Sequence, residues 1–183
     1  MEIDHRLELL DDRQVALVEQ SLRDIVEDLG ARPPIPNRIA AESPPATPRL
    51  AGLVYCLPAR ADRDELAGAM LVQLLQQQGF EAQSAPTKLG AGELIDLVKK
   101  AGAAVVCISV VAPSTVLHAR YLCLKLRALL PKQRIVVGLW GATENVIDAA
   151  RRVRDSGADE VVTTLADAVM RLASLTPPLS EPN

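Results

Sequence analysis

Residues 103–138, AAVVCISVVAPSTVLHARYLCLKLRALLPKQRIVVG, contain the alternation that decides the fold. Two short apolar runs, AAVVCIS at 103–109 and RIVVG at 134–138, are rich in Val and Ile and predict strands buried on both faces. The segment between them, 114–130, has apolar residues at helical spacing and is stopped by Pro131. A strand, a helix and a second strand in this order predict a right-handed βαβ unit with parallel strands.

The same alternation continues on both sides of this unit. We expect further strands at 51–57, 80–85 and 160–163, and further helices at 62–78, 91–101, 144–156 and 166–175. Five strands connected by single helices indicate an α/β protein. The predicted architecture is a three-layer flavodoxin-like fold with a five-stranded parallel sheet in the order 2-1-3-4-5.

Three other segments surround this domain, which we place at residues 50–176. Residues 1–30 are expected to form an acidic helical arm, because nine acids against three arginines give it a net charge of −6. Residues 31–49 hold six of the thirteen prolines and are interpreted as an extended linker, and residues 177–183 as a flexible tail. The arm carries an apolar seam at helical spacing, made of Val15, Val18, Leu22, Ile25 and Leu29. Since a free helix of this length is marginal in water, we expect the seam to pack on the α/β domain, on a second copy of itself or on a preceding membrane segment, and we prefer the homodimer.

Composition excludes several functions. The net charge of −3 over 183 residues gives no indication of nucleic-acid binding. The three cysteines, Cys56, Cys107 and Cys123, lack the spacing of a metal site and indicate reduced, structural thiols in the cytoplasm. No apolar stretch approaches the ~20 residues of a membrane helix.

In a sheet of this order, ligands bind beyond the carboxyl ends of the strands, near the switch point between strands one and three. This rule selects the loops at 58–64, 109–114, 138–143 and 163–165. Gly90-x-Gly92 lacks the third glycine of a dinucleotide fingerprint. The basic cluster is expected to be a solvated face; it consists of Arg120, Lys125, Arg127, Lys132 and Arg134.

In strand spacing and loop position, the selected loops resemble those of cobalamin-binding domains. Members of that family carry Asp-x-His-x-x-Gly after the first strand, with its Gly thirteen residues before the aromatic residue that opens strand two. Counting back from Phe80 places this motif on Asp62-Arg63-Asp64-Glu65-Leu66-Ala67. The Asp survives as Asp62, whereas the cobalt-ligating His has become Asp64 and the Gly has become Ala67.

Two further family motifs are partly preserved. The Ser-x-Leu after strand three resembles Ser109-Val110-Val111, and the Gly-Gly after strand four resembles Gly138-Leu139-Trp140-Gly141. If the crevice is used, its contacts should come from Asp62, Asp64, Ser109, Ser114, Gly138, Trp140 and Gly141. For Asp62 an N-cap is the simpler alternative to a ligand contact, and for Trp140 a core or rim position is the alternative to ligand stacking.

A carboxylate does not replace imidazole as the lower ligand of a nitrogen-preferring cobalt, and neither His5 nor His118 lies at a spacing that restores it. The resemblance therefore implies no metal site and no resident cofactor. Cobalamin without a protein histidine ligand stays an alternative. Ala67, Leu139 and Trp140 are expected to crowd the channel for its nucleotide tail.

Particular strings also resemble the C-terminal cytosolic region of bacterial permeases of the autoinducer-exporter family. They are CLPARADRDELAGAMLVQLL, HARYLCLKLRALLP and RIVVGLWG. This resemblance implies either the excised soluble part of a membrane transporter on the cytosolic face of the inner membrane or a stand-alone relative, and it implies no catalytic residues.

Three function classes follow. We favour a non-catalytic regulatory or interaction domain, which binds a small ligand or none. The first alternative is a corrinoid binder. An enzyme is disfavoured, because no acid–base pair or activated nucleophile can be assembled from these loops.

Overall fold

The computed structural model describes residues 12–31, 52–111, 115–142 and 145–175. The chain divides into two units, Met1–Pro34 and Ile35–Asn183, which are considered separately. The predicted linker and tail lie outside the described residues, except that helix α2 continues to Ala31.

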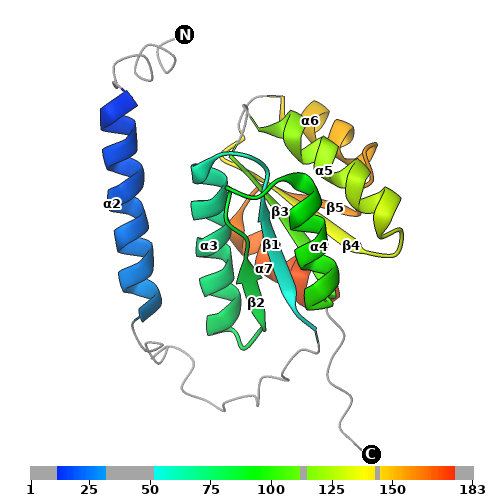
Figure 1. Cartoon of the computed structure of the whole chain (residues 1–183), viewed down its shortest axis with the longest axis horizontal. Coiled ribbons are helices and arrows are strands. Elements are labelled where there is room, and N and C mark those ends of the chain that lie inside the picture. The colour runs from blue at the N-terminus through cyan, green and yellow to red at the C-terminus, as the bar shows by residue number, and fades with distance from the viewer. Residues whose placement is uncertain (1–11, 32–51, 112–114, 143–144, 176–183) are drawn as a thin grey trace, which may run out of the picture. The chain divides into compact units, whose positions relative to one another are not determined.

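The larger unit has the predicted architecture (Figure 1). Its strands are β1 (Val54–Pro58), β2 (Ala82–Ser84), β3 (Val105–Val111), β4 (Arg134–Trp140) and β5 (Glu160–Val162). Its helices are α3 (Asp62–Gln77), α4 (Ala91–Ala101), α5 (Val116–Leu129), α6 (Val146–Arg154) and α7 (Leu165–Leu175). All neighbouring strands are parallel and their order is β2-β1-β3-β4-β5, which confirms the flavodoxin-like topology.

Helices cover both faces of this sheet, so the central strands must be apolar on both sides. On one face α4, α5 and α6 pack against alternate residues of the sheet, among them Leu57, Ile108 and Ile135. On the other face α3 and α7 pack against Val54, Cys107 and their neighbours. Residues 105–110 of β3 and 135–140 of β4 are buried without exception. This explains why the deciding stretch has apolar runs instead of an apolar–polar alternation.

The smaller unit contains α2 (Asp12–Ala31). The predicted seam lies on this helix, and its described members Val18, Leu22 and Ile25 are 50%, 45% and 54% exposed. Val26, which is not part of the seam, is buried. Across the described segments, no helix combines the length and the apolar character needed to cross a bilayer.

Candidate functional site

The predicted crevice lies at the carboxyl edge of the sheet, where the chain leaves β1 towards α3 and leaves β3 towards α5 (Figure 1). Strand register brings its residues together from distant parts of the sequence. Pro58 pairs with Ser109 across β1 and β3, and Ser109 pairs with Gly138 across β3 and β4. Two positions further along, Val111 pairs with Trp140.

Asp64 occupies the centre of this edge and points inward. Its side chain is fully buried, at 0% exposure. One carboxylate oxygen, Oδ2, accepts hydrogen bonds from the backbone N–H groups of Arg60 and Ala61, both at 2.9 Å. The other oxygen, Oδ1, accepts from the N–H of Val111 at 2.7 Å and from the hydroxyl of Thr115 at 3.1 Å. Asp64 thus ties the loop after β1 to the loop after β3, with two donors on each oxygen.

A buried carboxylate is tolerated only when its charge is compensated by donors. Asp64 meets this requirement with four hydrogen bonds and with its position in the first turn of α3, where the helix dipole favours a negative charge. The position that holds the cobalt ligand in the cobalamin family therefore holds a structural link in this chain.

Asp62 does not occupy the N-cap position that was one of its two expected roles. The N-cap position of α3 is Ala61, and Asp62 is the first helical residue. The carboxylate of Asp62 is exposed and accepts a hydrogen bond of 2.8 Å from the hydroxyl of Thr87, in the loop after β2. Thr87 also donates through its N–H and its hydroxyl to Glu65, at 2.8 and 2.9 Å. The predicted cap is therefore wrong by one residue, and Asp62 helps to hold the neighbouring loop.

Trp140 fills the sheet edge next to Asp64. Its indole Nε1–H donates to the hydroxyl of Ser109 at 2.7 Å, and both side chains are buried. The ring lies directly over Gly138, because a Cβ atom built there would overlap the ring atoms Cζ2 and Cη2. Ser109 is approached from α3 at Gly68, where a Cβ atom would lie 3.5 Å from the Cβ of Ser109. Of the two expectations for Trp140, the structure favours the core position.

The remaining predicted residues do not join this cluster. Gly141 is exposed and has a φ of +67°, a value suited to glycine at the turn that follows β4. Ser114 lies outside the described residues. Thr115, recognised in the sequence only as a hydroxyl at the start of a helix, and Gly68 were not among the predicted site residues, although a threonine just before a helix and a glycine inside one were both available as signals.

Arg127 was also misassigned, because the basic cluster was expected to be solvated. Its guanidinium donates to the carbonyl oxygens of Gly157 (2.7 Å), Pro131 (3.1 Å) and Gln133 (2.6 Å). It also forms an ion pair of 2.7 Å with Asp159. Arg127 thus joins α5 to the segments before β4 and β5 and has a structural role.

The three cysteines are free and buried, as predicted for structural thiols. Cys56 and Cys107 are paired across β1 and β3, and the hydrogen bond with Cys107, together with burial, raises the pKa of the Cys56 thiol well above 9.0. Burial raises the pKa of Cys123 to about 12, while the nearby Arg127 acts in the opposite direction. Both shifts favour the neutral, unreactive thiol.

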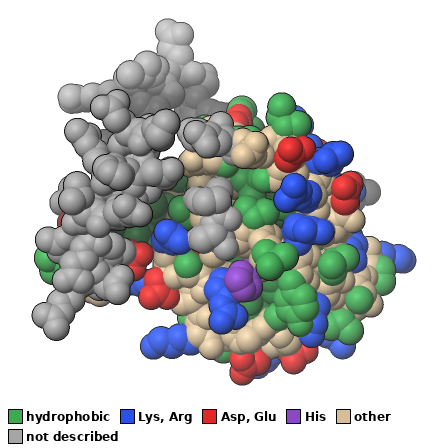
Figure 2. Space-filling view, turned by 90° about the horizontal axis from the view of Figure 1, so that it is seen from above, with side chains coloured by type: hydrophobic (Ala, Val, Ile, Leu, Met, Phe, Trp, Pro, Cys, Tyr) green, Lys and Arg blue, Asp and Glu red, His purple; other side chains and the backbone are tan. Residues whose placement is uncertain are grey.

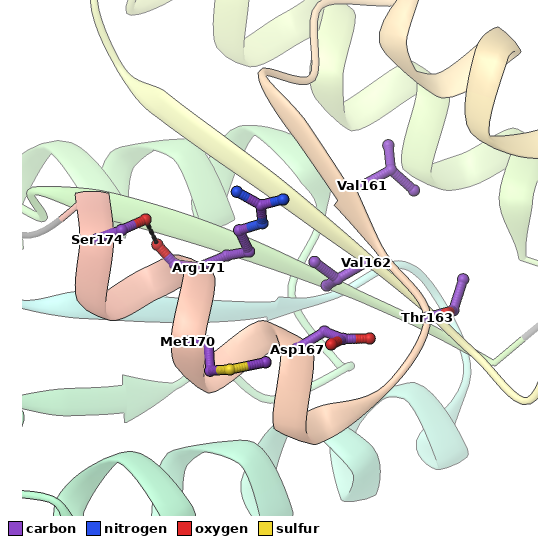
Figure 3. A pocket seen from close by; sticks show the side chains of 7 residues that line it. All are labelled: Val161, Val162, Thr163, Asp167, Met170, Arg171 and Ser174. Carbon is purple, nitrogen blue, oxygen red and sulfur yellow. Dashed lines mark hydrogen bonds between the residues drawn. The ribbon is translucent and has the colours of Figure 1, made fainter.

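Two of the cavities formed by the described residues, both away from the Asp64–Trp140 cluster, have volumes above 500 Å³. One, of about 520 Å³, lies between edge strand β5 and α7 (Figure 3). Its charged side chains are Asp167, which accepts a hydrogen bond from Thr164, and Arg171, which extends from α7 toward the strands. The other, of about 510 Å³, is bounded by the loops after β1 and β2 and by α5. No group of three or more His, Cys, Asp or Glu side chains suited to a metal ion occurs among the described residues.

Comparison with known proteins supports the fold. No family model matches the sequence, and no curated protein matches it. A cobalamin-binding protein from Desulfitobacterium hafniense DCB-2 is similar in structure, with 19% identity, a TM-score of 0.58 and an alignment covering 70% of this chain and 60% of that chain.

Signalling proteins have the same fold. A protein described as a response regulator from Chloroflexus aurantiacus J-10-fl has 17% identity and a TM-score of 0.53, over 68% of this chain and 96% of that chain. The CheY-like protein TadZ from Pseudomonas aeruginosa PAO1 has 15% identity and a TM-score of 0.53, over 70% and 98% of the two chains. At such identities the likeness shows a shared flavodoxin-like fold, and the resemblance to permeases receives no support from these comparisons.

Proposed function

We propose that the α/β unit is a non-catalytic regulatory or interaction domain whose crevice at the sheet edge is closed by its own side chains. The observation that carries this proposal is the environment of Asp64. Its exposure is 0%, and each carboxylate oxygen already accepts two hydrogen bonds. A ligand or metal at this position would have to displace several of these hydrogen bonds. Each buried donor that lost its acceptor in this way would cost about 1–3 kcal/mol.

The contact between Trp140 and Ser109 supports the same proposal. The indole ring occupies the space over Gly138, and the Ser109 hydroxyl is used by the indole N–H. A serine nucleophile needs a free hydroxyl and an adjacent base. The side chains of Ser109 and Asp64 are both engaged in hydrogen bonds that hold the sheet edge together, which favours a role without catalysis.

The alternative, a corrinoid held without a protein histidine, draws on the fold shared with the cobalamin-binding protein. Binding in the family manner would require the Trp140 ring to leave its place. Trp140 is the only tryptophan of the chain, so its fluorescence reports directly on the crevice.

The test is equilibrium dialysis of the full chain against methylcobalamin and aquocobalamin, with Trp140 emission and its quenching by acrylamide recorded in parallel. We expect no retained corrinoid and a blue-shifted, poorly quenched emission that the corrinoids leave unchanged after correction for their absorbance. The variant Ser109→Ala, which removes the indole acceptor, serves as the control that shows how a loosened ring responds. Stoichiometric retention of a corrinoid together with increased quenching would refute the closed crevice.

We also propose that this domain works on the cytosolic face of a membrane, beside a transporter. This setting rests on the permease-like strings CLPARADRDELAGAMLVQLL and HARYLCLKLRALLP alone. Fractionation of the native cells with an antibody against this chain tests it. The chain should sediment with the membranes, and its full recovery in the soluble fraction would refute the setting.

A further inference from the structure

The 510 Å³ cavity lies on the α4–α5 side of the sheet. It shares the loop after β1 with the predicted crevice but contains none of the seven residues predicted to contact a ligand there. Its rim is formed by Arg60 in the loop after β1 and by Lys88 in the loop after β2. Its wall is formed by Leu94 of α4 and by His118 and Tyr121 of α5. Figure 2 shows a histidine side chain exposed among Lys or Arg side chains and hydrophobic side chains. The volume lies within the range of about 300–1,000 Å³ typical of small-molecule sites.

Two cations border this cavity without a partner. The side chains of Arg60 and Lys88 are exposed, and neither makes an ion pair or hydrogen bond with another described residue. The loops that carry them are nevertheless held in place. The Arg60 N–H donates to Asp64, and Thr87, the residue before Lys88, is bonded to Asp62 and Glu65. Two positive charges are thus presented on supported backbone.

His118 adds an unsatisfied polar atom to the wall. Its Nδ1 is inaccessible to solvent and has no hydrogen-bond partner among the described residues. Buried polar atoms are nearly always paired, so an unpaired one that lines a cavity needs an explanation. A turn of the imidazole toward the cavity would let a ligand group form a hydrogen bond with Nδ1.

The first turn of α4 also borders the cavity, through Gly90 and Ala91. Its N–H groups and the helix dipole favour an anion, and Glu93 offsets part of this effect, because its carboxylate accepts the Gly90 N–H at 2.8 Å. Asp62 and Glu65 also lie at this rim, but their carboxylates accept hydrogen bonds from Thr87, whereas the side chains of Arg60 and Lys88 have no partner among the described residues. Deeper in the cavity the lining is apolar, with Leu94 and Leu122. The Tyr121 ring beside them lies under the Lys125 ammonium, 5.3 Å from the ring centroid.

We propose that this cavity binds a small organic phosphate. The phosphate lies between Arg60 and Lys88, where two cations and a helix N-terminus suit a dianion better than a single carboxylate. The apolar or aromatic part of the ligand lies against Leu94, Leu122 and Tyr121, and a polar group of the ligand forms a hydrogen bond with the imidazole of His118 once that ring turns toward the cavity. This site is separate from the Asp64–Trp140 cluster, and it stands whether or not the domain is catalytic.

The test uses the full chain, labelled with ¹⁵N, and three phosphate probes: phenyl phosphate, adenosine 5′-monophosphate and inorganic phosphate. We expect at least one of the two organic phosphates to bind more tightly than inorganic phosphate. The amide shifts should be confined to residues 59–60, 87–94 and 118–122. The Trp140 emission should stay unchanged, which separates this site from the crevice.

The matched variants are Arg60→Gln/Lys88→Gln, at the cavity, and Lys99→Gln/Lys100→Gln, at the other end of α4. The first should weaken binding about tenfold or more, as expected for the loss of charge-assisted hydrogen bonds, and the second should leave it unchanged. The single variant Lys88→Gln replaces the first pair if that pair fails to fold. Absence of binding by both organic phosphates, equal weakening in the two pairs, or shifts centred on Trp140 would overturn the proposal.

Discussion

At the scale of single residues, Asp64 combines two properties that rarely coexist, because its side chain is acidic and fully buried. Its partners explain how this is possible. Three of its four donors are backbone N–H groups, which every substitution at Arg60, Ala61 or Val111 except proline retains. The carboxylate itself is therefore the point at which this arrangement is sensitive to mutation.

We predict that Asp64→Asn lowers the free energy of unfolding by about 2–3 kcal/mol, because the amide NH₂ must face donors on one side and leaves them unpaired. Urea denaturation followed by circular dichroism measures the change. Asp62→Asn is the matched control, since Asp62 lies two residues away but is exposed, and it should change stability by less than about 1 kcal/mol. Equal effects of the two variants would contradict the structural role of Asp64.

Cys123 gives a prediction about alkaline pH. Burial raises the pKa of its thiol to about 12 in the folded chain, from an ordinary value of 9.0. The folded state therefore holds this proton more tightly than the unfolded chain. The resulting contribution to stability is complete below pH 9 and is lost as the pH rises towards 12.

The measurement compares the wild-type chain with Cys123→Ala in urea at pH 8 and pH 10.5, so that the titration of other groups cancels. The variant is less stable at pH 8, because it leaves a small cavity. The difference in unfolding free energy between the two proteins should shrink by about 2 kcal/mol at pH 10.5. A difference that is independent of pH would show that the thiol titrates alike in both states.

At the scale of elements, the side chain of Trp140 at the end of β4 lies over Gly138, two residues earlier in the same strand. Gly138 is needed for this close approach and not for an unusual backbone angle. We predict that Gly138→Ala destabilises the chain by about 1–3 kcal/mol through overpacking. In the background of Trp140→Leu, which removes the overlapping ring atoms, the same change should cost much less.

A double-mutant cycle measures this coupling, which should be about 1–2 kcal/mol. Gly92→Ala is the control, because a Cβ atom at this position in α4 meets nothing within 4 Å and a helical Gly→Ala change is favourable. Additive effects of Gly138→Ala and Trp140→Leu would mean that the ring does not occupy this position in solution.

The elements themselves could be predicted from sequence because their signals are local. Val-rich runs such as residues 103–109 encode buried strands. Pro131 predicts the end of the helix before it, and α5 ends at Leu129, two residues earlier. Arg127 shows the limit of such signals. Helical periodicity placed it on a basic face, whereas its four partners come from residues 131–159, which only the tertiary fold brings near.

At the scale of the whole molecule, the position of the crevice could be predicted from the sequence, but not that its own side chains fill it. Ser109, Gly138 and Trp140 do meet at the carboxyl edge of the sheet, as the switch-point rule predicts. The crevice is filled through contacts between residues that are far apart in the sequence. Asp64, for example, bonds to Val111 and Thr115, which follow it by 47 and 51 residues. The second cavity was missed for the same reason, because its lining comes from three separate segments.

The helical arm raises the question of what covers its apolar seam. Val18, Leu22 and Ile25 are about half exposed, and an isolated helix with such a seam is marginal in water. A symmetric pairing of two arms would cover the seam, since a two-fold axis matches a surface with itself. The net charge of −6 on residues 1–30 opposes this pairing, so added salt should strengthen it.

We therefore predict a homodimer of the full chain that dissociates in Leu22→Asp and tightens between low and high salt. Sedimentation velocity over a range of concentrations measures the state. Ser21→Asp is the control, because it adds the same charge to an exposed position one residue away from the seam. A chain that is monomeric at every salt concentration, or one that dissociates equally in both variants, would mean that this seam does not mediate self-association. Leu22→Asp and Ser21→Asp add the same charge to the arm. If only Leu22→Asp breaks the dimer, the loss of an apolar contact explains the effect, and the surface buried between the two arms is apolar.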